Sequence, residues 1–257
     1  MPPREFDAAI FDMDGVVTRT AAVHSRAWKQ MFDDYLRLRA ARTGGAFQEF
    51  TPGDYLAHVD GRPRYQGVAT FLKSRGIDLP QGTPDDSPGA ETVCGLGNCK
   101  NEIFNAIIAR EGAGLYDSTV ALIDDLRAQA IKVGLATSSR NSALILQKSG
   151  VAHLFGSVVD GIVSEQLGLQ GKPAPDIFQA ASARLGVVPD RAIVIEDAVT
   201  GVEAGASGGF ALVIGLAREH NHAELHEHGA DLVLTDLAET NLGKINAAIR
   251  AKRGRVS

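Results

Sequence analysis

The chain has 257 residues, of which 44% are hydrophobic and 22% are charged, and its formal net charge is −5 at pH 7. That length allows one large domain or two smaller ones with a substantial core. The negative balance disfavours nucleic acid as a partner, since phosphate backbones attract basic surfaces. No apolar run approaches the ~20 residues of a membrane helix, and the first residues lack the apolar core of a signal peptide. We expect a cytoplasmic protein with neither nucleic acid nor a membrane as a partner.

The first predicted element is a short buried strand that ends in two aspartates. The apolar residues 8–11 lead directly into Asp12 and Asp14, and Gly15 follows at once. In an extended geometry both carboxylates point the same way, so they repel unless a cation lies between them or one takes up a proton. A divalent cation, a phosphoryl group or a proton-transfer role would each explain the pair. A polar Asp-Gly turn without function is the alternative.

The next segment, from residue 19 to about 113, shows helical patterns and no strand candidate. The helical patterns cover residues 21–38, 51–59, 67–74 and 101–111. Residues 83–89, rich in proline, aspartate and glycine, predict a loop. Cys94 and Cys99 have neither metal-site spacing nor further cysteines for a disulfide framework, so we interpret them as ordinary thiols. The simplest interpretation is a helical domain inserted after the first strand.

From about residue 117 onward, predicted helices and strands alternate. The strands are expected at residues 131–136, 157–160, 192–195, 210–214 and 232–234. The helices are expected at residues 120–129, 141–149, 173–186, 199–207 and 236–250. Such alternation predicts a doubly wound parallel sheet of the α/β class. We therefore expect a core domain built from residues 1–18 and 114–257, and an inserted helical domain from residues 19–113.

Polar residues follow several of the predicted strands, and one lysine precedes a helix. Open parallel sheets bind their ligands beyond the carboxyl ends of the strands, so these side chains should face one crevice. They are Asp12, Asp14, Thr137, Ser138, Ser139, Arg140, Asn141, Lys172, Glu196 and Asp197.

Together these residue types suit phosphoryl transfer. Several carboxylates on one rim suit Mg²⁺, which takes oxygen ligands, and hydroxyls and amides at a helix start suit phosphate. A lysine can offset charge that develops on the transferring group. One carboxylate can act as a nucleophile and another as a general acid/base. Taken singly, each part also has a structural explanation, as a helix cap, a surface charge or a turn.

The order of these motifs resembles that of the haloacid dehalogenase superfamily. The matching segments are Asp12-Met13-Asp14-Gly15, Thr137, Lys172 and Glu196-Asp197. The resemblance spans nearly the whole chain and implies a Rossmann-like core with a helical cap of the C1 type. It implies that Asp12 is the nucleophile, which forms an aspartyl-phosphate, and that Asp14 is the general acid/base. Thr137 and Lys172 would bind the transferring phosphoryl group.

The same resemblance implies that Mg²⁺ is the cofactor. Its implied ligands are Asp12, the backbone carbonyl of Asp14, Asp197 and, in an assisting role, Glu196. Dehalogenases of this superfamily lack an acid/base at the position of Asp14, and phosphonatases have a small residue there. Asp14 therefore favours chemistry on phosphate esters, whose leaving alkoxide needs a proton.

A narrower resemblance is to the β-phosphoglucomutase-like subfamily. Residues 14–28, 134–141 and 171–178 are similar to segments of those enzymes, which also bind the phosphate that is not being transferred. The positions carried over as substrate-binding are Thr20, His24, Arg64, Lys100, Ser138, Ser139, Arg140 and Asn141. Arg140 replaces a lysine of the best-known members, which keeps the charge but changes the contacts it can make.

The narrower resemblance implies interconversion of β-D-glucose 1-phosphate and glucose 6-phosphate, through an aspartyl-phosphate and a β-glucose 1,6-bisphosphate intermediate. The alternative is a Mg²⁺-dependent phosphatase of sugar phosphates, which would use the same residues but admit water. A third hypothesis is a non-catalytic binding module that keeps the fold. Two clusters of phosphate-binding residues favour the mutase. We expect a monomer that acts on a small sugar phosphate.

Overall fold

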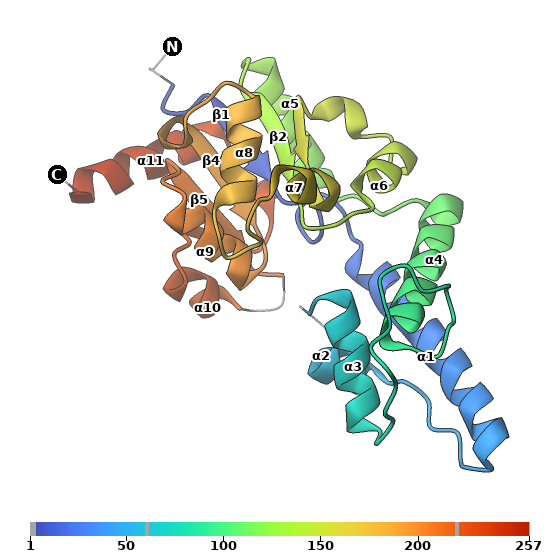
Figure 1. Ribbon diagram of the computed structural model, residues 1–257. Helices are drawn as coiled ribbons and strands as arrows, with labels where there is room; N and C mark the ends of the chain where they lie inside the picture. Colours follow the sequence, from blue (N-terminus) through green and yellow to red (C-terminus); the bar gives the residue numbers. More distant parts are fainter. Residues whose placement is uncertain (1–3, 60–61, 219–220, 257) are drawn as a thin grey trace. The chain divides into compact units, whose positions relative to one another are not determined.

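The computed structural model describes residues 4–59, 62–218 and 221–256. The chain forms two compact units, which are traced by colour in Figure 1. Residues 1–20 and 113–257 make up the first, called the core unit here, and residues 21–112 make up the second, the insert unit. Within the described residues, no helix is both long enough and apolar enough to cross a membrane.

The core unit is built on a parallel sheet with the strand order β3-β2-β1-β4-β5-β6. The strands are β1 (Ala8–Phe11), β2 (Lys132–Ala136), β3 (Ser157–Val159), β4 (Ala192–Glu196), β5 (Leu212–Leu216) and β6 (Leu232–Leu234). Strand β1 pairs with β2 on one side and β4 on the other, and all four of its residues are buried. The chain runs outward from β1 in both directions, so the topological switch point lies between β1 and β4.

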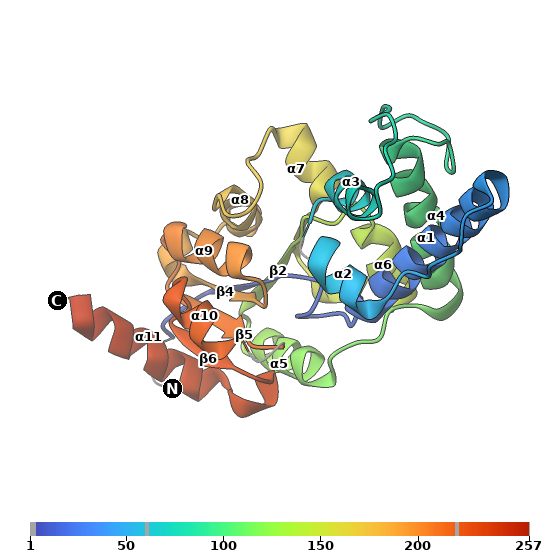
Figure 2. The same ribbon diagram turned by 90° about the horizontal axis from the view of Figure 1, so that it is seen from below.

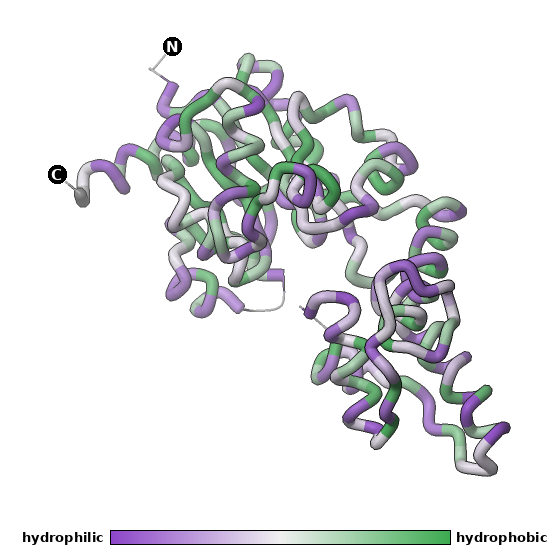
Figure 3. Tube along the Cα trace, viewed as in Figure 1, coloured by the Kyte–Doolittle hydropathy of each residue, from purple (hydrophilic) through white to green (hydrophobic). Residues whose placement is uncertain are grey.

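Helices cover both faces of this sheet. They are α5 (Asp117–Ala128), α6 (Ser142–Lys148), α7 (Gly161–Leu167), α8 (Asp176–Arg184), α9 (Val199–Ser207), α10 (His222–Glu227) and α11 (Leu242–Val256). Short 3₁₀ helices occur at η1 (Ala152–Leu154), η2 (Pro189–Arg191) and η3 (Leu237–Glu239). In Figure 2, α8 and α9 lie on one face and α5 and α11 on the other. Apolar residues concentrate along the central strands (Figure 3). The predicted doubly wound parallel sheet is confirmed.

Some element boundaries differ from the sequence prediction. The expected helix 236–250 is divided, because the Asp236 side chain caps the short η3 and α11 begins only at Leu242. Helix α7 was not predicted. The Asp160 carboxylate holds its first turn by accepting from the backbone N–H groups of Ile162 and Val163, and no residue of the helix is buried. A helix without a buried face has no apolar periodicity to reveal it.

The insert unit is helical within the residues described, as predicted. Its helices are α1 (Ala21–Thr43), α2 (Pro52–His58), α3 (Arg64–Ser74) and α4 (Val93–Glu111). Aromatic rings form its centre, where Phe32 stacks on Phe50 with ring centroids 5.0 Å apart and lies 4.1 Å from Phe71. Helix α4 begins at Val93 rather than at residue 101, with the Thr92 hydroxyl as its N-terminal cap. Both cysteines of this unit are free thiols.

Candidate active site

The ends of strands β1 and β4 bring Asp12 and Glu196 together. Phe11, which precedes Asp12, pairs in the sheet with Ile195, which precedes Glu196. The Asp12 N–H donates to the Ile195 carbonyl over 2.9 Å. The Lys172 Nζ lies 2.6 Å from Asp12 Oδ1 and 2.7 Å from Glu196 Oε2. Asp12 and Glu196 are buried, and the Lys172 side chain is only 10% exposed. A buried ammonium thus bridges two buried carboxylates at the topological switch point.

A third carboxylate, that of Asp197, completes an acidic cluster. One carboxylate oxygen from each of Asp12, Glu196 and Asp197 lies within 4.8 Å of the others. Glycines make room for these groups. A Cβ atom on Gly15, whose φ is +82°, would lie 1.7 Å from Asp197 Oδ2, and one on Gly201 would lie 2.1 Å from the Glu196 carboxyl carbon. Any side chain at either position would push a carboxylate out of the cluster.

With all three carboxylates ionised, the acidic cluster and Lys172 would together carry a net negative charge. Burial and then the Glu196 carboxylate raise the pKa of Asp12 to about 8, although Lys172 acts in the opposite direction. Burial and the neighbouring carboxylates likewise raise the pKa of Asp197 well above its usual value. Burial would lower the pKa of Lys172, but the Asp12 and Glu196 carboxylates outweigh it and hold that pKa above the usual range. The carboxylates outnumber the ammonium, and an all-oxygen donor set with excess negative charge fits Mg²⁺.

Asp14 faces a different set of partners. The Thr20 hydroxyl donates a hydrogen bond to Asp14 Oδ1. Thr18 Oγ1 lies 3.3 Å from Thr20 Oγ1 and donates to the Met13 carbonyl over 3.1 Å. Among the described residues, the Asp14 carboxylate is not part of the acidic cluster. The Asp14 charge nevertheless helps to raise the pKa values of Asp12 and Asp197, so the two aspartates have different hydrogen-bond partners but interact electrostatically. Thr20, predicted to bind substrate, contacts the predicted acid/base directly.

Thr137 and the residues after it continue strand β2 at the same edge of the sheet. The Thr137 N–H donates to the Val159 carbonyl over 2.9 Å, and its buried hydroxyl accepts from the Ser139 N–H over 3.1 Å. The Ser139 hydroxyl in turn accepts from the Asn141 N–H over 3.2 Å. Since β2 is a neighbour of β1, this hydrogen-bonded turn lies at the sheet edge that carries Asp12.

The two exposed residues of this turn lie at its outer side. Ser138 is exposed, and the Arg140 guanidinium forms an ion pair of 2.7 Å with Glu165 on α7. Both side chains of this pair are more than half exposed, at 53% and 67%. An exposed pair of this kind contributes little to stability, so Arg140 can exchange Glu165 for another anion at small cost.

Within the insert unit, His24 and Lys100 lie in direct contact. The Lys100 Nζ is 2.7 Å from His24 Nδ1 and lies over the rings of Trp28 and Phe104, at 5.0 and 4.9 Å from their centroids. His24 stacks on Phe104 with centroids 4.2 Å apart. Burial, followed by the charges of Lys100 and Arg64, lowers the pKa of His24 to about 3. The imidazole is therefore neutral at physiological pH and accepts from a buried cation.

Arg64 lies in the same unit, on the first turn of α3. Its Nη2 donates to Asn101 Oδ1 over 2.8 Å, which links α3 to α4. Its charge is one of the causes of the low pKa of His24, so it acts together with Lys100. The insert unit thus gathers the predicted substrate-binding residues His24, Arg64 and Lys100 into one cationic region, called the insert cation cluster here.

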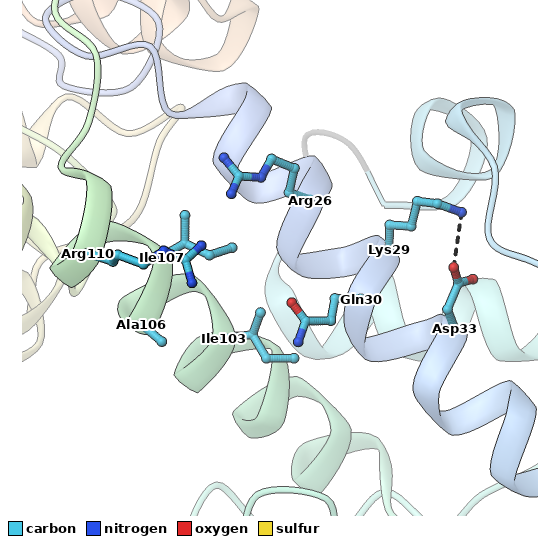
Figure 4. Close-up of a pocket in the computed structure, with 8 residues that line it drawn as sticks. All are labelled: Arg26, Lys29, Gln30, Asp33, Ile103, Ala106, Ile107 and Arg110. Carbon is cyan, nitrogen blue, oxygen red and sulfur yellow. Dashed lines mark ion pairs between the residues drawn. The ribbon is translucent and has the colours of Figure 1, made fainter.

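A surface groove of about 470 Å³ on helices α1 and α4 is a separate feature (Figure 4). Its cations are neutralised within the unit. Arg26 lies 2.7 Å from a Glu111 oxygen, Arg110 contacts the same carboxylate, and Lys29 lies 3.0 Å from Asp33. The predicted site residues, all of them described, lie outside its lining. The groove is therefore distinct from the predicted phosphate-binding residues.

The sequence interpretation missed Arg218. Its side chain reaches from the end of β5 to the Gly15 carbonyl, which it meets at 2.9 Å. Its position just beyond a strand could have singled it out, since residues that follow the strand ends were expected to form the site. Strand β5 was predicted to end at residue 214 and ends at Leu216, so that Arg218 was not considered.

The parallel sheet carries a helical insertion after its first strand and an acidic cluster at its switch point. Residues 6–209 match the family of haloacid dehalogenase-like hydrolases, and the chain belongs to that family. It is 45% identical over 241 residues to a β-phosphoglucomutase of Mycobacterium bovis, covering 92% of each chain. It is 32% identical to a β-phosphoglucomutase of Bacillus subtilis, covering 91% of this chain and 92% of that protein.

A solved structure shares the fold. The β-phosphoglucomutase of Clostridium difficile superposes with a TM-score of 0.70 at 23% sequence identity, covering 96% of this chain and 98% of that one. The family and the α/β core with a helical cap, both predicted from the motifs, are confirmed.

Proposed function

We propose that this protein is a Mg²⁺-dependent β-phosphoglucomutase that interconverts β-D-glucose 1-phosphate and glucose 6-phosphate. The observation that carries the proposal is the Lys172 ammonium held within 2.7 Å of both Asp12 and Glu196, beside a third carboxylate. The 45% identity to a mycobacterial β-phosphoglucomutase supports the choice of reaction.

In the proposed mechanism, an Asp12 carboxylate oxygen attacks phosphorus. The bond from phosphorus to the sugar oxygen breaks as the aspartyl-phosphate forms, and Asp14 gives its proton to the leaving oxygen. Lys172 lies against Asp12 and would offset negative charge on the transferring group. In the reverse transfer, Asp14 takes the proton from the attacking sugar hydroxyl. The hydrogen bond from Thr20 orients Asp14 for this role.

The acidic cluster is where Mg²⁺ would be held, by Asp12, Asp197 and the Asp14 carbonyl, with Glu196 assisting. The fit rests on the convergence of carboxylate oxygens within 4.8 Å and on the raised pKa values of Asp12 and Asp197. When bound, Mg²⁺ would offset the excess negative charge, keep Asp12 ionised and polarise the phosphoryl oxygens.

A mutase needs a second phosphate site, because its bisphosphate intermediate must be held at both ends. A plain phosphatase needs only one. The insert cation cluster of His24, Arg64 and Lys100 supports the mutase. Arg140 supports it as well, because its exposed ion pair with Glu165 can be replaced by a contact with phosphate at small cost in free energy. We infer that Arg64 binds the phosphate that is not being transferred.

The test is turnover of β-glucose 1-phosphate by the purified protein with Mg²⁺ and a trace of β-glucose 1,6-bisphosphate. We expect glucose 6-phosphate to form without an equivalent of inorganic phosphate. Release of inorganic phosphate in proportion to substrate consumed would instead identify a sugar-phosphate phosphatase with the same catalytic residues. Omitting the bisphosphate should slow the start of the mutase reaction, since the aspartate must first be phosphorylated.

The Arg64→Ala variant tests the second phosphate site. A hydrogen bond from a cation to phosphate is worth about 1.5–3 kcal/mol, so we expect mutase kcat/KM to fall about 10- to 100-fold. Hydrolysis of a simple monophosphate ester, which has no second phosphate, should change little. Arg62→Ala is the matched control, because Arg62 is an exposed arginine two positions away. Equal losses on both substrates would rule out Arg64 as the distal phosphate ligand.

A further inference from the structure

Arg218 ties the chain beyond strand β5 to the loop that follows β1. Its side chain is 15% exposed. Its Nε donates to the Gly15 carbonyl over 2.9 Å, and its Nη1 donates to the Thr235 carbonyl over 3.0 Å. One guanidinium thus spans the carboxyl ends of three strands, since Gly15 follows β1 and Thr235 follows β6.

An aromatic ring fixes the plane of this guanidinium. The Arg218 guanidinium carbon lies 3.7 Å from the centroid of the Tyr116 ring, and that of Arg19 lies 4.8 Å from the same centroid. Tyr116 is anchored in turn, because its N–H donates to the Val17 carbonyl over 3.1 Å. Arg218 is therefore held between a fixed ring and a fixed carbonyl, where a planar guanidinium fits and an ammonium would not.

Gly15 is the residue in this loop that most needs a restraint. With φ at +82° and no side chain, its backbone has access to many conformations. The Gly15 N–H donates to the Thr18 carbonyl over 2.9 Å, which fixes the peptide plane shared with Asp14. Arg218 fixes the next plane by binding the Gly15 carbonyl. Both peptide planes of Gly15 are thus pinned, directly after the aspartate that we assign as acid/base.

We propose that Arg218 is a positioning residue for Asp14. It touches no reacting atom. It holds Gly15, and through Gly15 the short loop from Asp12 to Thr18, in the one conformation that presents the Asp14 carboxylate to the leaving oxygen. This inference rests on the proposed function, in which Asp14 supplies the proton.

The test compares two leaving groups in the Arg218→Met variant, which keeps an apolar stem but removes every N–H donor. A sugar alkoxide needs a proton from Asp14 to depart, whereas p-nitrophenolate departs as a stable anion. Displacing a catalytic group by about 1 Å can cost 10²-fold. We therefore expect kcat for β-glucose 1-phosphate to fall about 10- to 100-fold, with KM little changed. The first-turnover burst of p-nitrophenolate from p-nitrophenyl phosphate, which reports formation of the aspartyl-phosphate before water attacks it, should fall much less. Asp14→Ala serves as the reference for this selective pattern.

Arg191→Met is the matched control. Arg191 also donates to two backbone carbonyls, those of Glu5 at 3.0 Å and Arg4 at 3.1 Å, but it precedes β4 instead of following a strand. Its loss should change both activities by the same factor. The same result for Arg218→Met, or no loss at all, would overturn the positioning role.

A second pair of variants covers the case in which Arg218→Met fails to fold. Tyr116→Phe keeps the ring beneath the guanidinium and should behave as wild type, whereas Tyr116→Leu removes it and should show the selective loss. Equal behaviour of the two variants on both substrates would overturn the proposal. If the wild-type protein hydrolyses p-nitrophenyl phosphate but turns over no sugar phosphate, the proposed function is wrong, and the inference built on it falls with it.

Discussion

Replacing Asp12 by asparagine is expected to abolish phosphoryl transfer, lowering kcat by about 10⁴-fold or more. The amide is a poor nucleophile and cannot form the aspartyl-phosphate, while its size and its contact with Lys172 are retained. The measurements are steady-state turnover and acid-quenched labelling with a substrate carrying a radioactive phosphoryl group. Wild-type protein should retain the label on Asp12, and the variant should retain none.

The same substitution should leave the fold intact or make it more stable. Burial and the Glu196 carboxylate raise the pKa of Asp12 to about 8, so its charged form is costly without a metal. A neutral side chain removes that cost. We therefore expect the metal-free variant to unfold at the same temperature as wild type or higher at pH 8 and above. Loss of activity together with a lower unfolding temperature would attribute the effect to misfolding.

Asp7→Asn is the control for the loss of a charged aspartate. Asp7 lies just before β1, where it pairs with Arg191 at 2.8 Å, and it lies outside the acidic cluster. Its replacement should leave kcat unchanged. Turnover by the Asp12 variant above a few per cent of wild type, or label found on another residue, would contradict the assignment of Asp12 as nucleophile.

The strand pattern predicted the sheet and the meeting of Asp12 with Glu196, because hydrophobic runs locate buried strands and parallel strands end at one edge. The start of helix α4 could not be predicted from such patterns. Its first turns contain Gly95 and Gly97, which are unfavourable in a helix, and the helical pattern predicted a helix only from residue 101. The structure explains both glycines. A Cβ on Gly95 would lie 2.4 Å from the Ala90 carbonyl oxygen, and one on Gly97 would lie 2.7 Å from the Tyr65 ring.

The sequence pattern also did not predict which side chains would contact one another. The motifs predicted Arg140 as a phosphate ligand, but its partner Glu165 lies on α7, a helix with no buried face and therefore no apolar pattern. Arg218 was missed because a strand end was placed two residues too early. The contact between Arg140 and Glu165 joins residues 25 positions apart, and local periodicity carries no information about it.

Replacing Lys172 by methionine is expected to lower both activity and stability. In the folded protein the ammonium bridges Asp12 and Glu196, and breaking a buried ion pair from one side costs about 3–5 kcal/mol, because the remaining charge is left uncompensated. Loss of a preorganised cation beside the transferring group should lower kcat by about 10²- to 10³-fold. The measurements are kcat and urea unfolding, each with and without Mg²⁺.

The stability loss should depend on pH with a definite sign. The pKa of Asp12 is about 8 in the folded protein and 3.8 normally, so the folded state holds this proton more tightly. The contribution of Asp12 to stability is therefore full below about pH 4 and is lost as pH rises toward 8. Lys172 opposes this loss, since its charge lowers the pKa of Asp12. Without Lys172 that pKa rises further, so the decline in stability continues to higher pH.

We therefore expect the unfolding free energies of metal-free Lys172→Met and wild type to differ least near pH 5, where Asp12 is protonated in both proteins. The difference should be largest near pH 9. Saturating Mg²⁺ should reduce the difference in unfolding free energy between the variant and wild type, because a divalent cation offsets the negative charge of the same carboxylates. Lys132→Met is the matched control, since the Lys132 Nζ donates to the Leu185 carbonyl over 2.6 Å and contacts no member of the acidic cluster. Its effect should be small and independent of pH. A Lys172→Met gap that stays constant from pH 5 to 9, or that widens with Mg²⁺, would mean that Lys172 does not balance the charge of this cluster.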